Sequence, residues 1–166
     1  DIDCVANAGA RNRSMSENSG LPGNAVESVM GSPHSELLGS EFAGFDQETA
    51  TATMRFTIKD QMTSWRGGVQ GGLVAGYLDD VMGYAYVAAT GGEQAPLNLE
   101  ISLQLLGLIP RGATIIGKGR VVRGGRRVIF LEGELLSEEG QVLARATSTA
   151  IPTMRPSPTE TGMGKG

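Results

Sequence analysis

Two adjacent carboxylates, Asp79 and Asp80, lie in the middle of a long apolar segment, residues 70–92 (QGGLVAGYLDDVMGYAYVAATGG). The segment contains no lysine or arginine, whereas a solvent-exposed helix usually carries bases three or four residues from its acids. A carboxylate in apolar surroundings is a candidate general base or nucleophile. The alternative is a solvated acidic patch within a helix. On a helix Asp80 points about 100° away from Asp79, so we assign Asp80 a structural role.

A pair of glycines, Gly71 and Gly72, opens the same segment. The first amides of a helix have no acceptor within the helix, and glycine lets a ligand carbonyl approach them closely. Such amides can stabilise negative charge on a carbonyl oxygen during acyl transfer. Asp79 lies roughly 12 Å from Gly71 along one helix. One carbonyl cannot contact both, so the spacing predicts a two-fold dimer in which antiparallel helices bring Gly71 of one chain to Asp79 of the other.

The spacing of apolar residues predicts the helix and strands that must position Asp79 and the two glycines. Apolar residues lie nearly all round the segment 70–92, which indicates a helix buried on most sides. Residues 48–58 alternate as a strand, with 40–45 as its hairpin partner and a helical turn at 35–39 before them. After the helix, period-two alternation and turns at Pro110 and at Gly124 and Gly125 predict a four-stranded antiparallel meander of residues 97–108, 113–123, 126–137 and 141–151.

The economical packing of these elements is a curved antiparallel sheet wrapped around one long central helix. A sheet of this kind needs one face covered, and only one long helix is available to cover it. This is the α+β hot-dog fold. A helix packed across one end of the sheet is the alternative.

Composition favours one globular domain. The 166 residues are 40% hydrophobic and 19% charged, with a net charge of −4. An acidic chain is not expected to coat nucleic acid or an anionic membrane. We expect a flexible N-terminal segment at 1–34, a hot-dog domain at 35–152 and a flexible tail at 153–166, with Cys4 and His34 as surface residues.

The chain has one cysteine and one histidine, too few for a disulfide framework or a Cys/His metal site. We therefore expect no metal and no cofactor. A lone cysteine fits a reducing compartment, and the N-terminus lacks a basic stretch followed by an apolar run, so the prediction is a cytoplasmic protein.

The helix and the strands that follow it resemble the PaaI-type (phenylacetate-pathway) acyl-CoA thioesterases of the hot-dog superfamily. The signature of that family is His-Gly-Gly at the start of the central helix, an acid nine residues after the histidine and a glycine four residues further on. Gln70-Gly71-Gly72, Asp79 and Gly83 have this spacing. The other register, which begins at Arg66, places Ala75 at the acid position and is rejected. The resemblance covers roughly residues 35–152.

The resemblance implies an acyl-CoA thioesterase in which Asp79 is general base or nucleophile and the Gly71 amide polarises the thioester carbonyl. Gly72 belongs to the same substrate-binding turn. Two positions depart from the family pattern. Gln70 replaces the usual histidine, and Ser64 stands where many members have Asn or Gln.

Asn98 matches the position at which relatives carry a Ser or Thr that orients the attacking water. Three arginines, Arg123, Arg126 and Arg127, flank the predicted Gly-Gly turn. They could contact the phosphates of coenzyme A, and solvated hairpin charge is an equally good explanation.

The expected partners are an acyl-CoA substrate and further copies of the chain, as a homodimer or homotetramer, with no nucleic acid or membrane. A non-catalytic acyl-thioester-binding hot-dog protein is the alternative from another functional class. An enoyl-CoA hydratase is less favoured, because that chemistry relies on an Asp/His pair and His34 lies outside the catalytic stretch.

Overall fold

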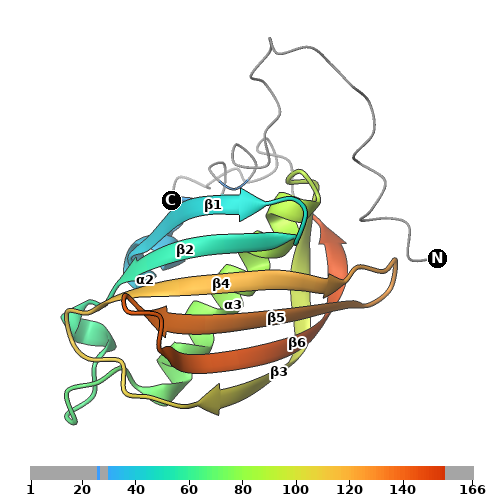
Figure 1. Cartoon of the computed structure of the whole chain (residues 1–166). Helices are drawn as coiled ribbons and strands as arrows, with labels where there is room; N and C mark the ends of the chain where they lie inside the picture. Colours follow the sequence, from blue (N-terminus) through green and yellow to red (C-terminus); the bar gives the residue numbers. More distant parts are fainter. Residues whose placement is uncertain (1–25, 27–29, 156–166) are drawn as a thin grey trace, which may run out of the picture.

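The computed structural model describes residue 26 and residues 30–155, in which an antiparallel sheet curves around one long helix (Figure 1). The predicted α+β hot-dog class is confirmed. The elements, in chain order, are α2 (Pro33–Leu38), β1 (Ser40–Asp46), β2 (Thr51–Thr57), the 3-10 turn η2 (Asp60–Met62), α3 (Gly71–Ala89), β3 (Gln94–Leu105), β4 (Thr114–Arg123), β5 (Ile129–Ser137) and β6 (Val142–Met154).

The central helix α3 begins and ends at the glycine pairs that the sequence indicates. Gln70 is its N-cap, and after Thr90 the chain turns through Gly91 and Gly92, whose φ angles are +63° and +86°. The Gly92 amide donates to the Val87 carbonyl at 2.8 Å, which closes the last turn. The 19 residues of α3 span roughly 28 Å.

The sheet approaches α3 closely because glycines face the helix. A side chain at Gly119 of β4 would overlap the carbonyl of Val81, and a Cβ at Gly133 of β5 would lie 2.9 Å from Met82 Cγ. The buried face of β4 consists of alternate residues, which include Ile115 and Gly119.

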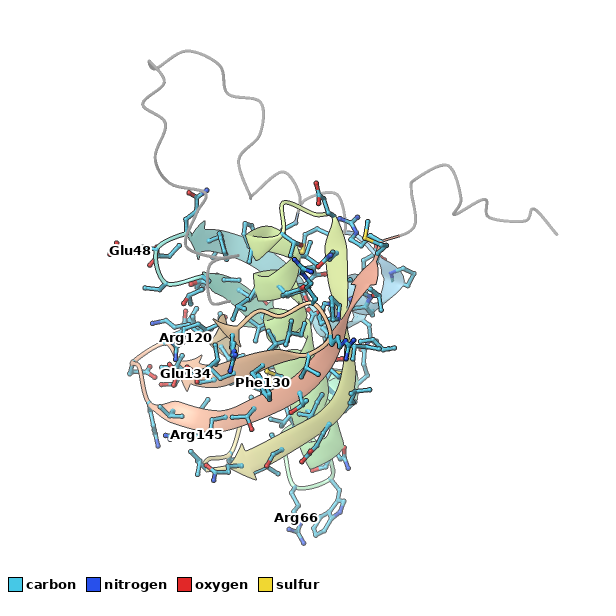
Figure 2. The ribbon with its side chains drawn as sticks, turned by 90° about the vertical axis from the view of Figure 1, so that its right-hand side faces the viewer. Glu48, Arg66, Arg120, Phe130, Glu134 and Arg145 are labelled. Carbon is cyan, nitrogen blue, oxygen red and sulfur yellow. The ribbon has the colours of Figure 1, made fainter. Side chains whose placement is uncertain are left out.

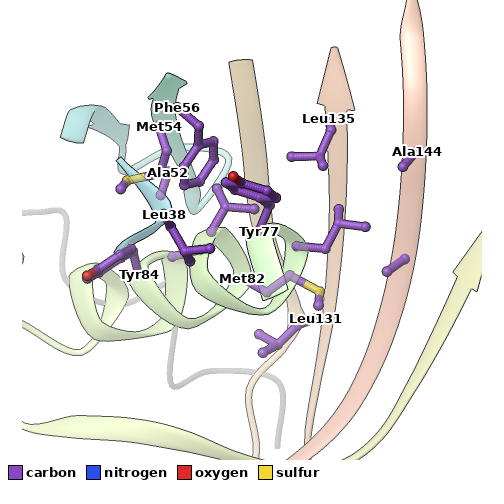
Figure 3. Close-up of a cluster of buried hydrophobic side chains, with 14 of the residues drawn as sticks. Leu38, Ala52, Met54, Phe56, Tyr77, Met82, Tyr84, Leu131, Leu135 and Ala144 are labelled. Atoms are coloured by element: carbon purple, nitrogen blue, oxygen red, sulfur yellow. The ribbon is translucent and has the colours of Figure 1, made fainter. Parts of the chain in front are cut away.

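Large apolar side chains fill the space between α3 and the sheet, as Figure 3 shows. Tyr77 of α3 packs edge-on against Phe56 of β2, with ring centroids 5.1 Å apart and planes at 72°. Burying each such side chain stabilises the fold by about 1.5–3 kcal/mol. Desolvation raises the pKa of the Tyr77 phenol to about 12.

The strand order is β1-β2-β4-β5-β6-β3, and every pairing is antiparallel. The predicted four-stranded meander is therefore wrong for its first strand: β4, β5 and β6 form a meander, while β3 pairs with β6 at an edge. The position beside β4 is taken by β2, where Met54 lies opposite Gly117. The chain between β3 and β4 passes the start of α3, where the Val69 amide donates to the Ile109 carbonyl at 2.9 Å.

Two predicted boundaries differ from the structure. β5 begins at Ile129, so Arg126 and Arg127 lie in a five-residue loop, 124–128, rather than in a strand after a two-residue turn. β6 continues to Met154 because its end pairs with β3, where Gln94 lies opposite Met154.

Structured residues are also found before position 35, where the domain is expected to begin. Val26 is fully buried in the core, and α2 starts at Pro33, whose fixed φ suits the first helical position. An isolated valine in a polar stretch gives no periodic signal, so the sequence does not predict its burial. Cys4 and most of the predicted flexible ends lie outside the described residues. No helix of the described part of the chain is long and apolar enough to cross a membrane.

Candidate active site

The start of α3 is capped by Gln70, the residue at the family's histidine position. Its side-chain Oε1 accepts a hydrogen bond from the Leu73 amide at 3.2 Å. The Gln70 carbonyl accepts from the amides of Leu73 and Val74, at 2.8 and 3.2 Å. The amides of Gly71 and Gly72 precede these bonds and are the helix donors left for a ligand carbonyl. This capping role of Gln70 was not predicted from the sequence.

Asp79 and Asn98, which the sequence proposes for one site, are brought together by α3 and β3. Asn98 Nδ2 donates a hydrogen bond to Asp79 Oδ1. Ser148 of β6 donates from Oγ to Asn98 Oδ1 at 2.6 Å, so the amide is fixed with its nitrogen toward Asp79. Ser148 is buried and was not predicted, because its proximity depends on the β3–β6 pairing.

The environment of Asp79 changes its acidity. Asp79 is exposed on the single chain, yet the surrounding protein desolvates its carboxylate, and this raises the pKa above the ordinary value of 3.8. The charge of His34 and the hydrogen bond from Asn98 act in the opposite direction. A raised pKa makes the carboxylate a stronger base than a solvated aspartate.

Asp80 is buried, in agreement with its predicted structural role, and it has partners that the sequence did not indicate. Ser40 Oγ donates to Asp80 Oδ2 at 2.7 Å, and His34 Nε2 lies 3.1 Å from Asp80 Oδ1. Burial raises the pKa of Asp80, and both hydrogen bonds lower it. The prediction for His34 was incomplete: its side chain is 62% exposed, and it also binds the central helix.

A pocket of about 490 Å³ opens beside the two carboxylates. Gly76 and Gly83 lie on the Asp79 face of α3, and a Cβ at either would meet no atom within 4 Å. The carboxylate is thus accessible along the helix from both directions. The pocket is lined by His34, Leu38, Gly76, Asp79, Asp80, Gly83, Tyr84, Val87, Ala95, Pro96 and Arg155.

Of the predicted site residues, Asp79 lines this pocket, whereas the others do not: Ser64, Gln70, Gly71, Gly72, Asn98, Arg126 and Arg127. Ser64 stabilises the turn before α3, where its Oγ donates to the Gly68 carbonyl at 3.1 Å. Arg66 projects from this turn, at the bottom of the molecule in Figure 2. Arg126 and Arg127 are exposed in the loop 124–128, between β4 and β5.

A larger hollow, of about 690 Å³, lies on the outer face of the sheet, away from α3. Figure 2 shows Arg120, Glu134 and Arg145 on this face. Arg120 Nη2 lies 2.6 Å from Glu132 Oε1, and Glu134 lies between Lys118 and Arg145 in the strand pairing. These charges compensate one another across strands, as on a solvated sheet face. Among the described residues, no three His, Cys, Asp or Glu side chains are arranged to hold a metal ion.

The thioesterase superfamily model matches residues 67–144, a range that includes the start of α3, Asp79 and Asn98. No curated protein matches the sequence.

Solved structures share the fold. A phenylacetic acid degradation-related protein from Ralstonia eutropha JMP134 is 27% identical, with a TM-score of 0.67 over 78% of this chain and 98% of that chain. The PaaI protein of E. coli is 17% identical, with a TM-score of 0.69 over 79% and 91%. The protein smu.793 from Streptococcus mutans UA159, solved with acetyl-CoA bound, is 19% identical, with a TM-score of 0.63 over 71% and 91%. Residues 67–144 are therefore similar to the thioesterase superfamily, the chain shares its hot-dog fold with these structures, and both similarities support a hydrolase acting on thioester bonds.

Proposed function

We propose that the protein hydrolyses acyl-coenzyme A thioesters to a free acid and coenzyme A, with Asp79 as general base or nucleophile. The observation that carries this proposal is the hydrogen-bonded series Ser148–Asn98–Asp79, which ends in a carboxylate beside an open pocket. Structural neighbours solved with acetyl-CoA and with coenzyme A support this substrate class.

Hydrolysis needs a group that activates the attacking oxygen and donors that stabilise the carbonyl oxygen. As a base, Asp79 takes a proton from water while the water oxygen bonds to the thioester carbon. As a nucleophile, its carboxylate oxygen attacks that carbon, and water then cleaves the anhydride. In both routes the C–S bond breaks, the sulfur receives a proton, and one water is consumed. Asn98 holds the Asp79 carboxylate in one orientation.

The Gly71 amide is the proposed donor to the carbonyl oxygen, with Gly72 and Gln70 in the same turn. Gly71 and Asp79 lie roughly 12 Å apart along α3, so a complete site requires Gly71 of a second copy of the chain. β3 is an edge strand with large exposed apolar side chains, among them Leu97 at 54% and Leu99 at 62%. An apolar edge strand is suited to pairing with another chain, which supports a homodimer or a pair of dimers.

Arg126 and Arg127 are proposed to bind the phosphates of coenzyme A. Both are exposed, and neither has an ion-pair partner among the described residues. Free guanidinium groups on a loop can hold phosphates without taking part in the chemical step. A cytoplasmic location belongs to the same proposal, since coenzyme A thioesters are the substrate that it assumes.

The geometry also favours testing a second activity, that of an enoyl-CoA hydratase. An enoyl-CoA hydratase uses an Asp/His pair, and His34 lies in the pocket with Asp79 although the two are far apart in sequence. The argument from sequence against a hydratase therefore no longer holds, and the assay must include an unsaturated substrate.

The experiment is a panel of short, long and aromatic acyl-CoA thioesters, in which released thiol is measured with a colorimetric reagent and bound substrate is measured by calorimetry. The proposal expects thiol release from at least one member. Binding without thiol release across the panel would identify a non-catalytic acyl-thioester-binding protein. Water addition to crotonyl-CoA without thiol release would identify a hydratase.

A further inference from the structure

The imidazole of His34 is held by hydrogen bonds at both ring nitrogens. Nε2 lies 3.1 Å from Asp80 Oδ1, and Nδ1 lies 2.9 Å from Ser32 Oγ. An ionised carboxylate only accepts hydrogen bonds, so Nε2 carries a hydrogen. Nδ1 then accepts from the Ser32 hydroxyl when the ring is neutral and donates to it when the ring is charged. The ring therefore keeps its orientation in both protonation states.

The helix that carries His34 is fixed to α3 at a second point. Ser35 Oγ lies 2.6 Å from the Tyr84 hydroxyl, one turn beyond Asp80, and both groups are buried. Ser32 Oγ joins the two contacts, at 2.8 Å from Ser35 Oγ. Leu38, at 8% exposure, packs into the core at the end of α2. These contacts place a titratable cation at a defined position over the central helix.

His34 and Asp79 line the same pocket. The other ionisable groups that line the pocket are Asp80 and Tyr84 on α3 and Arg155 after β6, whose guanidinium donates to the Gly92 carbonyl at 3.0 Å. The imidazole thus bonds to Asp80 and lines the same pocket as the preceding carboxylate, Asp79. The imidazolium charge lowers the pKa of Asp79, against the effect of burial.

We propose that His34 is a positioning residue of the Asp79 site: Asp80 and Ser32 orient its imidazole in the pocket that Asp79 lines, where a positive charge on the ring favours the reactive carboxylate of Asp79. The inference rests on the proposed thioester hydrolysis at Asp79. It assigns a role to a segment outside the matched range 67–144. It also gives Asp80 a function: to hold the imidazole rather than to react.

The test separates the charge of His34 from its structural contacts. His34→Gln can still donate to Asp80 and accept from Ser32, but it has no charge, whereas His34→Ala loses both. Glu36→Gln changes an exposed charge on the same helix and is the control. For His34→Gln and His34→Ala, the acid limb of kcat/KM should move to higher pH, with activity several-fold lower on that limb and within about twofold of wild type at pH 8.

Loss of activity by the same factor at every pH, or only in His34→Ala, would show that His34 acts as a structural contact and would overturn the proposal. An unchanged profile in His34→Gln would overturn it as well. These outcomes leave the proposed function intact, because that is tested by thiol release from wild type and by Asp79 variants.

A second readout needs no substrate. His34 is the single histidine of the sequence, so tag-free protein gives one imidazole resonance by NMR. Electrostatic coupling between two sites is reciprocal. The chemical shift of this resonance should therefore change in Asp79→Asn and remain unchanged in Glu36→Gln. A resonance that does not respond to Asp79→Asn contradicts the proposal.

Discussion

Replacing Asp79 by asparagine removes the charge and basicity of one side chain and leaves its shape. Asn98 Nδ2 can donate to the new Oδ1 as it does to the carboxylate, so the contact between α3 and β3 is retained. Turnover should fall by at least about 10²-fold, the lower range for a positioned acid–base group, which corresponds to about 2.7 kcal/mol of transition-state stabilisation.

The variant should remain folded. A carboxyl whose pKa is raised in the folded state stabilises the fold below its unfolded pKa, and this contribution is lost as the pH rises through the folded pKa. Burial raises the pKa of Asp79, so its ionised form does not stabilise the fold at neutral pH. We therefore expect the melting temperature of Asp79→Asn at pH 7 to be no lower than that of wild type.

The assay is thiol release from the best acyl-CoA of the panel, as kcat and kcat/KM from pH 4 to 9. Wild-type kcat/KM should fall with decreasing pH in a limb above pH 3.8, the ordinary value for aspartate, because burial raises the pKa of Asp79. Asp80→Asn is the matched control and should keep far more activity at pH 8. If Asp79→Asn were folded and as fast as wild type, the assignment of catalysis to this helix would be wrong.

Three further predictions concern the surroundings of the site. Replacing both Arg126 and Arg127 by alanine should raise KM with little change in kcat; an unchanged KM, or a loss in kcat alone, would argue against phosphate binding. Asn98→Ala should lower kcat by about tenfold or more, and Ser148→Ala less, since Ser148 acts through Asn98; equal activity of all three proteins would exclude this relay. Light scattering at assay concentrations should give the mass of a dimer or tetramer, and Leu99→Lys on the β3 edge should dissociate it with loss of activity; an active monomer would refute the shared site.

The sequence predicts well those features that one element determines by itself. The α3 boundaries follow from glycine pairs and apolar residues, and the strand β4 follows from the alternation of its residues. The order of the strands in the sheet cannot be predicted in this way, because the residues of β3 alternate in the same way whether β3 pairs with β4 or with β6. The meander was wrong for that reason, and Ser148, which is near Asn98 only through the β3–β6 pairing, could not be found.

In the candidate site, too, features set by one element were predicted, whereas contacts between distant elements were not. The spacing of Gly71 and Asp79 along one helix selects both as candidates, and Asn98, chosen by resemblance, lies beside Asp79 in the structure. His34 was assigned to the surface because a histidine 46 positions before Asp80 has no local signal of contact with it. Gln70 was expected to bind substrate, whereas its side-chain contact in the structure is the cap on the Leu73 amide, an interaction that any residue with a suitable acceptor could make.

The glycines beneath α3 have a consequence for which substitutions the enzyme can tolerate. At Gly119 an added methyl group would meet the backbone of Val81 and Met82, so the helix itself would have to move, and Asp79 lies only two residues before Val81. Asp79 is bonded to Asn98 on a different strand, so a shift of α3 away from β4 changes that distance directly. A substitution on the far side of the helix, without any contact with substrate, would thus alter the reactive geometry while the hydrophobic core remained filled. The alignment of the Asp79 carboxylate is therefore set partly by the absence of side chains in the sheet behind it.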